Sequence, residues 1–595
     1  FWLRSPTHDK PNDMLDAISA GDIYGKKMIQ SESFTELRNR WDEYPGMLKA
    51  LQDRNFALGI NRMVFHVFTG NPWIDRKPGM TLGGVGLFFQ RDQTWWKQAK
   101  AWVEYTERCQ RLLQQGRNVK DIAVFTGEEI PRRAVLPDRL VNTLPGIFGK
   151  TKIKEERKRL ANEGNPVQQV PKGVKSSANI TTPAAWIDPL NGYGYDSFNK
   201  DAFLRLMKVK DGNIVLPGGA VYKILVFPNL DKMNPNGNLM SLEVAEKILQ
   251  LVKEGATVLL DQYPVATTGL YHYKEENEAL KSVTKELFGK DIPSTGKRAF
   301  FIRHIGKGNL MIGQYPLPDF DTVHVARDVI IKNADNINAH DIAWTHRSVA
   351  GDSKDLYFLS NQRDSTAIIR FGFKIKNKLP ELYDAVADKW YDCKDWYCKN
   401  GYTWITLRFD PNASWFVIFD KATQKSGVHN GNNWMAYKNV ETLEGAWNVM
   451  FNKDTFRFPQ LTDWTKMPQK EIKYFSGTAV YSKDFTVQNL RGKDKTLWLS
   501  LGNVKDIAQV KLNGVDCGIA WTYPYKIDIT KAIREGSNHL EIEVTNTWAN
   551  RLIGDSFLKP ADRTTFTTAP FYLQGESLLS AGLLGPVILQ SSVNN

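Results

Sequence analysis

The chain has no run of 18 or more apolar residues among its 595 residues, which excludes a helix that crosses a membrane. Cysteine is also scarce, and so low a number excludes a disulfide scaffold. The four cysteines are Cys109, Cys393, Cys398 and Cys517. Cys393 and Cys398 could pair locally or remain free thiols. No second Cys/His pair lies near them in the sequence, so a zinc site is not indicated.

Neither an initiator Met nor a signal peptide opens the sequence, which begins Phe1-Trp2-Leu3-Arg4. We therefore expect a mature or truncated piece of a longer protein. At roughly 150 residues per domain, the length indicates about three to five domains. Hydrophobic residues make up 42% and charged residues 24% of the chain, which is ordinary for globular protein.

Signals for nucleic-acid binding are missing, although the formal net charge is +13. The only dense basic stretch, residues 150–159, contains two Glu. No zinc-finger spacing or RNP-type aromatic motif accompanies it. The excess of positive charge is therefore interpreted as a solvated surface.

Residues 1–117 carry the alternating pattern of an α/β fold, with apolar runs of strand type followed by stretches of helical periodicity. The expected elements are a strand at 23–32, a helix at 44–58, a strand at 61–68, a Gly-rich loop at 71–91 and a helix at 94–115. Two such βα units cannot close a barrel, which needs eight and about 200 residues or more. If the units belong to a barrel, most of it precedes Phe1.

The remaining chain changes pattern twice, so the predicted fold class is multidomain α/β plus all-β. Strands at 119–126, 222–227 and 256–260 and a helix at 242–254 indicate a doubly wound domain. Short alternating strands follow, and Asn513-Gly514 is a strong hairpin signal. The expected domains are the end of a (β/α)8 barrel (1–117), a flavodoxin/amidotransferase-like α/β domain (118–297), a β-sandwich (298–435) and a galactose-binding-like jelly roll (436–595).

Glu32 is the candidate catalytic residue, because it ends an apolar run before a polar turn. In parallel barrels, catalytic groups stand at the carboxyl ends of strands. The sequence around Glu32 is rich in Trp, as carbohydrate sites often are. Glycoside hydrolysis usually needs two carboxylates, and Glu32 is a candidate for one of them. The alternative is a loop or helix-start glutamate without a catalytic role.

Substrate-binding candidates lie on the second strand and the loop after it. His66 could hydrogen-bond a sugar hydroxyl or hold Glu32, or it could be a core histidine. Asn61 and Arg62 begin the same strand. On the loop, Trp73 offers an aromatic face and Asp75 a carboxylate that takes a pair of hydroxyls. A packed loop Trp and a turn Asp are the alternatives, and of Trp95 and Trp96 at least one should be core.

Other acidic and aromatic residues are weaker candidates. Glu128 and Glu129 follow the strand at 119–126, where a structural or rim role competes with an acid/base role. Three aspartates could bind calcium, but their spacing is not that of an EF-hand and a turn-rich surface loop is favoured. They are Asp188, Asp196 and Asp201. Carbohydrate-binding candidates on the last domain are Trp521, Tyr523, Trp548 and Arg551.

Ordered motifs along nearly the whole chain carry a family resemblance. They include IYGKKMIQSESFT (23–35), ALGINRMVFH (57–66), NPWIDRKPGMTLG (71–83), VFTGEE (124–129), HRSVAGDSKDLYFLSNQ (346–362) and NTWANRLIGD (546–555). Taken together, the set resembles family 106 glycoside hydrolases, the α-L-rhamnosidases. The family motif (A/S)-E-(A/S)-F-T corresponds to Ser31-Glu32-Ser33-Phe34-Thr35. One departure is Gly70-Asn71 before Pro72, where many relatives have a His.

The resemblance implies an inverting hydrolase that removes terminal α-L-rhamnose from plant-type glycans and glycosides. It also implies an exported protein, a (β/α)8 barrel followed by β domains, and an association of calcium with the site. The family uses two glutamates, of which Glu32 matches the later one; we favour it as the general base. The earlier one has no counterpart after Phe1, so we expect the upstream segment to be required and this chain alone to be inactive.

Two alternatives remain open at the level of sequence. One is a non-catalytic carbohydrate-binding protein or remnant. The other is a related exo-glycosidase, β-galactosidase-like, with another sugar specificity. Fold alone does not separate them.

Overall fold

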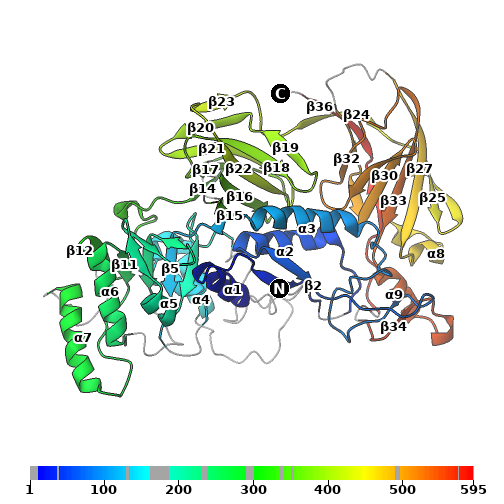
Figure 1. Ribbon diagram of the computed structural model, residues 1–595. Coiled ribbons are helices and arrows are strands. Elements are labelled where there is room, and N and C mark those ends of the chain that lie inside the picture. The colour runs from blue at the N-terminus through cyan, green and yellow to red at the C-terminus, as the bar shows by residue number, and fades with distance from the viewer. Residues whose placement is uncertain are drawn as a thin grey trace.

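The computed structural model places four regions side by side, each built on its own sheets (Figure 1). It describes residues 11–36, 39–128, 133–160, 187–228, 238–289, 300–335, 339–349, 354–488, 496–571, 573 and 575–593. Helices α1 to α3 lie in the centre, the α/β region at one end and the last β region at the other. No helix among these residues has the length and apolar character needed to span a bilayer.

The central region contains two βα units. Its elements are α1 (Pro11–Ile23), β1 (Gln30–Ser33), α2 (Pro45–Leu58), β2 (Arg62–Phe65) and α3 (Ala99–Leu113). The strand expected at 23–32 is shorter and starts later. Met14, Leu15 and Ile18 have helical spacing, and α1 buries all three. Strands β1 and β2 pair in parallel, with Glu32 opposite Val64.

The β1–β2 sheet has one covered and one open face, because side chains alternate along a strand. On the covered face, Met63 is buried and Phe65 stacks on Trp102 of α3 at 4.8 Å. The open face carries Gln30, Glu32, Arg62 and Val64, all of them exposed. The two strands are all that the described residues contribute to a barrel, whose closure stays a prediction.

Helix α2 buries a polar network. Lys49 Nζ lies 2.6 Å from Asp53 Oδ2 and 2.9 Å from Ser414 Oγ, and Lys49 and Asp53 are 1% and 0% exposed. Tyr105 of α3 donates to Asp53 Oδ1 at 2.5 Å. Ser414 begins a strand of the neighbouring β-sandwich, so the network joins α2 and α3 to that sandwich.

The α/β region is a six-stranded sheet with the order β12-β13-β11-β10-β5-β6. Strands β5, β6, β10, β11 and β13 are parallel and follow the doubly wound order 2-1-3-4-5, with β12 antiparallel at the edge. Their bounds are β5 (Ile122–Phe125), β6 (Tyr195–Phe198), β10 (Ile224–Phe227), β11 (Thr257–Leu260), β12 (Phe301–Ile305) and β13 (Gly308–Ile312). The other elements are α4 (Pro145–Leu160), α5 (Lys200–Arg205), α6 (Leu242–Glu254), α7 (Tyr273–Phe288), β7 (Lys208–Lys210), β8 (Asn213–Val215) and β9 (Val221–Tyr222).

The boundary expected at 297 lies later than the sequence pattern indicated. The β12–β13 hairpin has the short alternating pattern of an all-β domain, but β13 pairs in parallel with β11. Residues up to Ile312 therefore belong to the α/β sheet.

Two sheets face each other in the β-sandwich. One has the order β14-β17-β21-β20-β23 and the other β19-β18-β22-β16-β15-β4. The strands of the first are β14 (Val329–Asn333), β17 (Ala367–Phe373), β20 (Asp395–Lys399), β21 (Tyr402–Phe409) and β23 (Gly427–His429). Those of the second are β4 (Arg117–Asn118), β15 (Ile342–Val349), β16 (Lys354–Asn361), β18 (Lys378–Asp384), β19 (Lys389–Asp392) and β22 (Ser414–Ala422).

A buried histidine sits between two carboxylates in this sandwich. His346 Nδ1 lies 2.8 Å from Asp328 Oδ2, and its Nε2 lies 3.1 Å from Asp355 Oδ1. Burial lowers the pKa of His346, but the charge of Asp328 and hydrogen bonds to both carboxylates outweigh it and raise the pKa to about 9. His346 is therefore a buried cation at neutral pH.

We expect this histidine to make the protein less stable at alkaline pH. The pKa of His346 rises from 6.5 when unfolded to about 9 when folded, so its contribution is full below pH 6.5 and is lost as pH rises through 9. That shift corresponds to about 3 kcal/mol in the free energy of unfolding. Thermal unfolding between pH 6 and pH 10 should show this loss of stability. The dependence of stability on pH should be weaker in His346→Gln. His429→Gln, at an exposed histidine, is the control; an unchanged pH dependence in His346→Gln would contradict the assignment.

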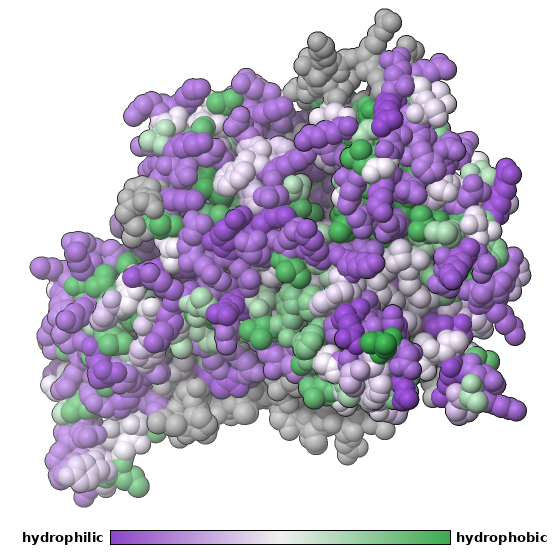
Figure 2. All heavy atoms as spheres, turned by 45° about the vertical axis from the view of Figure 1, so that its right-hand side comes forward, coloured by the Kyte–Doolittle hydropathy of each residue, from purple (hydrophilic) through white to green (hydrophobic). Residues whose placement is uncertain are grey.

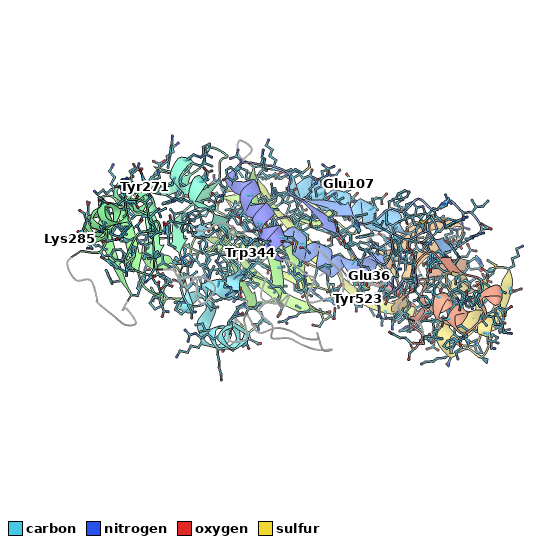
Figure 3. The ribbon with its side chains drawn as sticks, turned by 90° about the horizontal axis from the view of Figure 1, so that it is seen from below. Glu36, Glu107, Tyr271, Lys285, Trp344 and Tyr523 are labelled. Carbon is cyan, nitrogen blue, oxygen red and sulfur yellow. The ribbon has the colours of Figure 1, made fainter. Side chains whose placement is uncertain are left out.

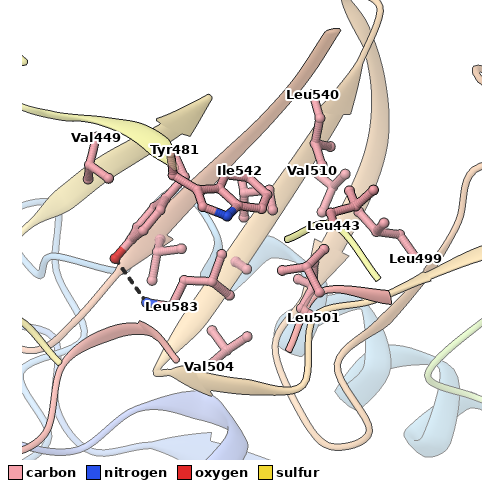
Figure 4. Packing of buried hydrophobic residues seen from close by; sticks show 14 of the residues in the cluster. Leu443, Val449, Tyr481, Leu499, Leu501, Val504, Val510, Leu540, Ile542 and Leu583 are labelled. Atoms are coloured by element: carbon pink, nitrogen blue, oxygen red, sulfur yellow. Dashed lines mark hydrogen bonds between the residues drawn. The ribbon is translucent and has the colours of Figure 1, made fainter. Parts of the chain in front are cut away.

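The last β region is also a sandwich, with sheet orders β24-β36-β28-β32 and β26-β25-β27-β33-β30-β31. Its core includes Tyr481, whose hydroxyl accepts the Leu583 N–H at 3.1 Å (Figure 4). The Asn513-Gly514 hairpin is confirmed: it joins β30 to β31 with positive φ at both residues. The strands are β24 (Ala436–Thr442), β25 (Trp447–Phe451), β26 (Asp454–Phe458), β27 (Thr478–Val487), β28 (Leu497–Ser500), β29 (Asn503–Lys505), β30 (Ile507–Leu512), β31 (Val515–Ala520), β32 (Lys526–Asp528), β33 (Gly536–Thr545), β35 (Gly582–Gly585) and β36 (Ile588–Val593).

All four cysteines are free thiols. Cys393 is buried and donates to Asn433 Oδ1 at 3.3 Å, whereas Cys398 is exposed. The local Cys393–Cys398 pair that the sequence left open does not form.

Candidate functional site

Glu32 stands on the open face of the β1–β2 sheet, one residue before β1 ends. Its Oε1 accepts a hydrogen bond of 2.7 Å from the Thr35 hydroxyl. Phe34, between them, has a φ of 68°, a left-handed conformation that costs a non-glycine residue about 1 kcal/mol or more. The Phe34 ring packs edge-on against Trp102 at 5.1 Å, which holds this turn in place. The carboxylate is therefore exposed but rigidly positioned.

The loops after β1 and β2 form one rim at the carboxyl ends of the strands. The Gly86 N–H donates to the Glu36 carbonyl at 2.7 Å, and the Leu87 N–H donates to the His66 carbonyl at 2.9 Å. Figure 3 shows Glu36 on this rim, far from Tyr271 and Lys285 of the α/β region. The end of the α/β region that carries Tyr271 and Lys285 is thus remote from this rim.

His66 is a half-buried residue directly after β2. Its backbone N–H donates to the Ser33 carbonyl at 3.0 Å, which ties the two strand ends together. Its Nδ1 is buried and has no hydrogen-bond partner among the described residues. An unsatisfied imidazole nitrogen at the rim is suited to a ligand hydroxyl.

Asn61 and Arg62 lie at the opposite, amino ends of the strands. Asn61 is 1% exposed; its side chain accepts from the Ile29 N–H at 2.8 Å and donates to the Lys27 carbonyl at 2.9 Å. The prediction of a sugar contact for Asn61 does not fit this position, because both amide atoms join the strand starts. Arg62 is exposed on the same face as Glu32, two residues nearer the amino end of its strand.

Trp73 and Asp75 both lie on the loop after β2. Trp73 is half-buried and packs edge-on against Phe566 at 5.2 Å, whereas Asp75 is exposed. Asn71, which occupies the place of the family His, is buried and donates to Asp92 Oδ2 at 2.9 Å. Asn71 therefore supports the loop from inside. Of the two tryptophans before α3, Trp95 is core, as expected, and Trp96 is partly exposed.

A segment of the last β region completes this rim, which the sequence did not predict. Strand β34 (Phe566–Thr567) pairs in parallel with β3 (Pro78–Gly79) of the loop after β2. Helix α9 (Ala549–Ser556) packs Leu552 against Trp41 and Phe88 of the two rim loops. Figure 1 shows the dark blue loops beside α9 and β34. The motif at 546–555 contains Leu552, but nothing in its local pattern indicates that this residue packs against the rim loops.

Two of the four carbohydrate-binding candidates of the last β region, Trp521 and Trp548, take part in contacts between regions instead. Trp521 is 2% exposed and packs in the core around α2 and α3. The Trp548 Nε1–H donates to the Asp92 carbonyl at 2.7 Å, and Arg551 pairs with Asp555 at 2.5 Å. Of the four candidates, Tyr523 is the exposed one, at 46%.

Glu128 belongs to the α/β sheet, not to the Glu32 rim. It accepts the Ser241 N–H at 2.8 Å, before α6, and pairs with Lys200 at 3.0 Å. These contacts fit a structural role and not the acid/base role that sequence left open. Glu129 lies outside the described residues.

The three aspartates considered for calcium do not form a cation site. Asp188 accepts from Trp344 Nε1 and Asp196 from the Tyr222 hydroxyl, and both are buried. Asp201 is held by Arg205 at 2.5 Å. Because Asp188 and Asp196 are buried, they do not lie in the exposed, turn-rich loop that the sequence predicted. In the described part of the chain, no group of three or more His, Cys, Asp or Glu side chains could hold a metal ion.

Comparison with known proteins supports one family. The model described as glycoside hydrolase family 106, alpha-L-rhamnosidase, matches residues 1–151 and 162–393, and a galactose-binding domain-like model of glycosyl hydrolase 2 matches 463–555. The solved structure of a rhamnosidase from Novosphingobium sp. PP1Y is 31% identical with a TM-score of 0.79, over 99% of this chain and 50% of that one. A protein of Formosa agariphila named "Putative beta-glucuronidase" is 24% identical, over 99% of this chain and 65% of its own length.

The chain therefore spans half of the solved relative and about two thirds of the other. The family model covers well over half of the chain, including the β1–β2 sheet with Glu32. On these grounds, the chain belongs to the alpha-L-rhamnosidase family of glycoside hydrolases, family 106.

Proposed function

We propose that the polypeptide carrying this chain removes terminal α-L-rhamnose from glycans or glycosides by an inverting two-carboxylate mechanism, with Glu32 as the general base. The observation that carries this proposal is the position of Glu32. It is an exposed carboxylate at a strand end, on an open sheet face, within the chain segment that matches the family.

The geometry at Glu32 suits a general base. An inverting enzyme needs a carboxylate that accepts a proton from water and, about 6.5–9.5 Å away, a carboxylic acid that protonates the leaving oxygen. The Thr35 hydroxyl donates to Glu32 Oε1, an arrangement that suits the ionised carboxylate. We propose that the partner acid lies in the part of the relatives that this chain does not span. His66 Nδ1 is the proposed contact to a sugar hydroxyl.

Export and calcium dependence are proposed on the family resemblance alone. The described residues offer no cluster for a cation, so no step of the mechanism is assigned to calcium.

The test is hydrolysis by the polypeptide that carries this chain. We expect release of the aglycone from an aryl α-L-rhamnoside, with β-rhamnose as the first anomer seen by NMR. Aryl β-D-glucuronide and aryl β-D-galactoside should be cleaved far more slowly. Preference for either of these would favour the alternative exo-glycosidase, rhamnose binding without turnover would favour a carbohydrate-binding protein, and α-rhamnose as the first product would refute inversion.

A further inference from the structure

The rim carries an aromatic and cationic cluster contributed by two distant parts of the chain. The Arg76 guanidinium lies over the Trp73 ring and the Phe566 ring, at 5.5 Å from each ring centroid. The two rings meet edge to face at 5.2 Å. Arg76 is exposed and both rings are half-buried, so the cluster is open to solvent.

We propose that Trp73, Arg76 and Phe566 form a binding site for an acidic sugar, a uronate, next to the sugar that is cleaved. The proposal rests on the proposed function, because it assigns the cluster to a sugar bound beside the one whose cleavage Glu32 would assist. Trp73 follows β2, whose partner strand β1 carries Glu32, so both belong to the same rim.

The aromatic pair supplies the apolar half of this recognition. Sugar rings present faces of C–H groups, and ligand sites usually combine apolar or aromatic walls with a few well-placed polar groups. Strand β2 and the loop after it, which carries Trp73 and Arg76, also expose apolar side chains. They are Val64, Phe68, Ile74, Leu82 and Val85. On the face shown in Figure 2, hydrophobic residues also gather in the lower middle.

Arg76 supplies the charged half. Its neighbours Lys77 and Arg91 both pair with Asp92, at 3.7 and 3.3 Å. Within the described ranges, no carboxylate lies at ion-pair distance from Arg76, so its guanidinium is available to a ligand. A guanidinium binds a carboxylate through two parallel hydrogen bonds. Asp75 is the exposed acid next to it in sequence and would repel an acidic ligand.

The cluster is held in place from both sides, which reduces the entropy lost on binding. The Phe566 N–H donates to the Lys77 carbonyl at 2.8 Å, and the Thr81 N–H donates to Thr568 Oγ1 at 2.9 Å. Asp555, which is buried, accepts the N–H groups of Thr564 and Thr565 at 2.9 and 2.7 Å. The segment leading to Phe566 is thus fixed to α9.

The net charge agrees with an acidic ligand. A formal charge of +13 produces a positive field that attracts polyanionic glycans and speeds their encounter. The sequence alone does not indicate an anionic ligand for this charge.

The experiment measures binding by calorimetry, using the full polypeptide with Glu32→Gln to prevent turnover. The two ligands are α-L-rhamnosyl-D-glucuronic acid and its methyl ester, which differ in the carboxylate charge. We expect the acid to bind about tenfold more tightly, a difference of about 1.4 kcal/mol. Arg76→Gln should remove that difference and leave ester affinity within about twofold. Phe566→Ala should weaken both ligands equally. The matched control Arg534→Gln, at an exposed arginine of the last β region, should leave the preference for the acid unchanged.

Three outcomes overturn the inference. Equal affinity for the acid and the ester in the protein that retains Arg76 would refute the charged site. An unchanged preference for the acid after Arg76→Gln would also refute it. Cleavage of an aryl α-L-rhamnoside, measured in parallel on the protein with Glu32 intact, separates the two proposals. If that cleavage occurs while acid and ester bind equally, the acidic-sugar site fails and the proposed function stands. If neither ligand binds and no rhamnoside is cleaved, both fail.

Discussion

Replacing Glu32 by Gln is expected to lower kcat for α-L-rhamnoside hydrolysis by about 10²–10⁴-fold, with a much smaller change in KM. The amide keeps the size of the side chain and can still accept from the Thr35 hydroxyl, but it cannot take a proton from water. Kinetics over a range of pH provide the measurement. The fall in kcat should persist at every pH tested, because the amide cannot act as a base.

Glu107→Gln is the matched control for this substitution. Glu107 is an exposed glutamate of α3, and Figure 3 shows it well apart from Glu36 on the rim. Its replacement should leave kcat and KM unchanged. If Glu32→Gln retained the activity of the Glu107→Gln protein, Glu32 would not be the general base.

Replacing Lys49 by Met is expected to destabilise the protein by about 3–5 kcal/mol, since removal of one partner leaves the other charge buried. Asp53 is 0% exposed and would keep the Tyr105 hydroxyl but lose its cation. Burial already raises the pKa of Asp53, an effect that Lys49 opposes. Thermal and denaturant unfolding of the purified variant should show the loss as a lower Tm and midpoint.

An exposed pair on α3 provides the control. Lys100 pairs with Glu104 at 3.6 Å and its side chain is 75% exposed, so Lys100→Met should cost at most about 1 kcal/mol. The double variant Lys49→Met, Asp53→Leu should recover much of the stability, because it removes both buried charges. Equal losses for Lys49→Met and Lys100→Met would show that the buried network adds nothing.

Elements with strong periodicity were predictable from the sequence, whereas their surroundings were not. The helix expected at 242–254 and the strand expected at 256–260 are α6 and β11 within a residue. Helix α2 was also predicted, but its polar side chains are buried instead of facing solvent. Lys49 and Asp53 lie at the interface with the β-sandwich, and Gln52 bonds Thr106 of α3. The partner of this polar face, Ser414, is 365 residues from Lys49. No local pattern reports such a contact.

The candidate site shows the same division. Glu32 and His66 were identifiable because strand ends can be recognised from apolar runs. Asn61 is also a polar residue next to a strand, but it lies at the amino end. There its side chain holds the two strand starts together. Phe566 was beyond prediction, because its place beside Trp73 depends on two chain segments almost 500 residues apart.

The pairing of β3 with β34 has a consequence for how such proteins diversify. A C-terminal β domain that only followed the others in sequence could be exchanged or lost as a module. Here its α9–β34 segment packs against the loops after β1 and β2 of the central region. Recombination at the sequence boundary near 435 would therefore take the two halves of one surface from two different parent proteins. If the proposed site binds a ligand, changes in this terminal domain would alter ligand preference without any change to the strand that bears Glu32.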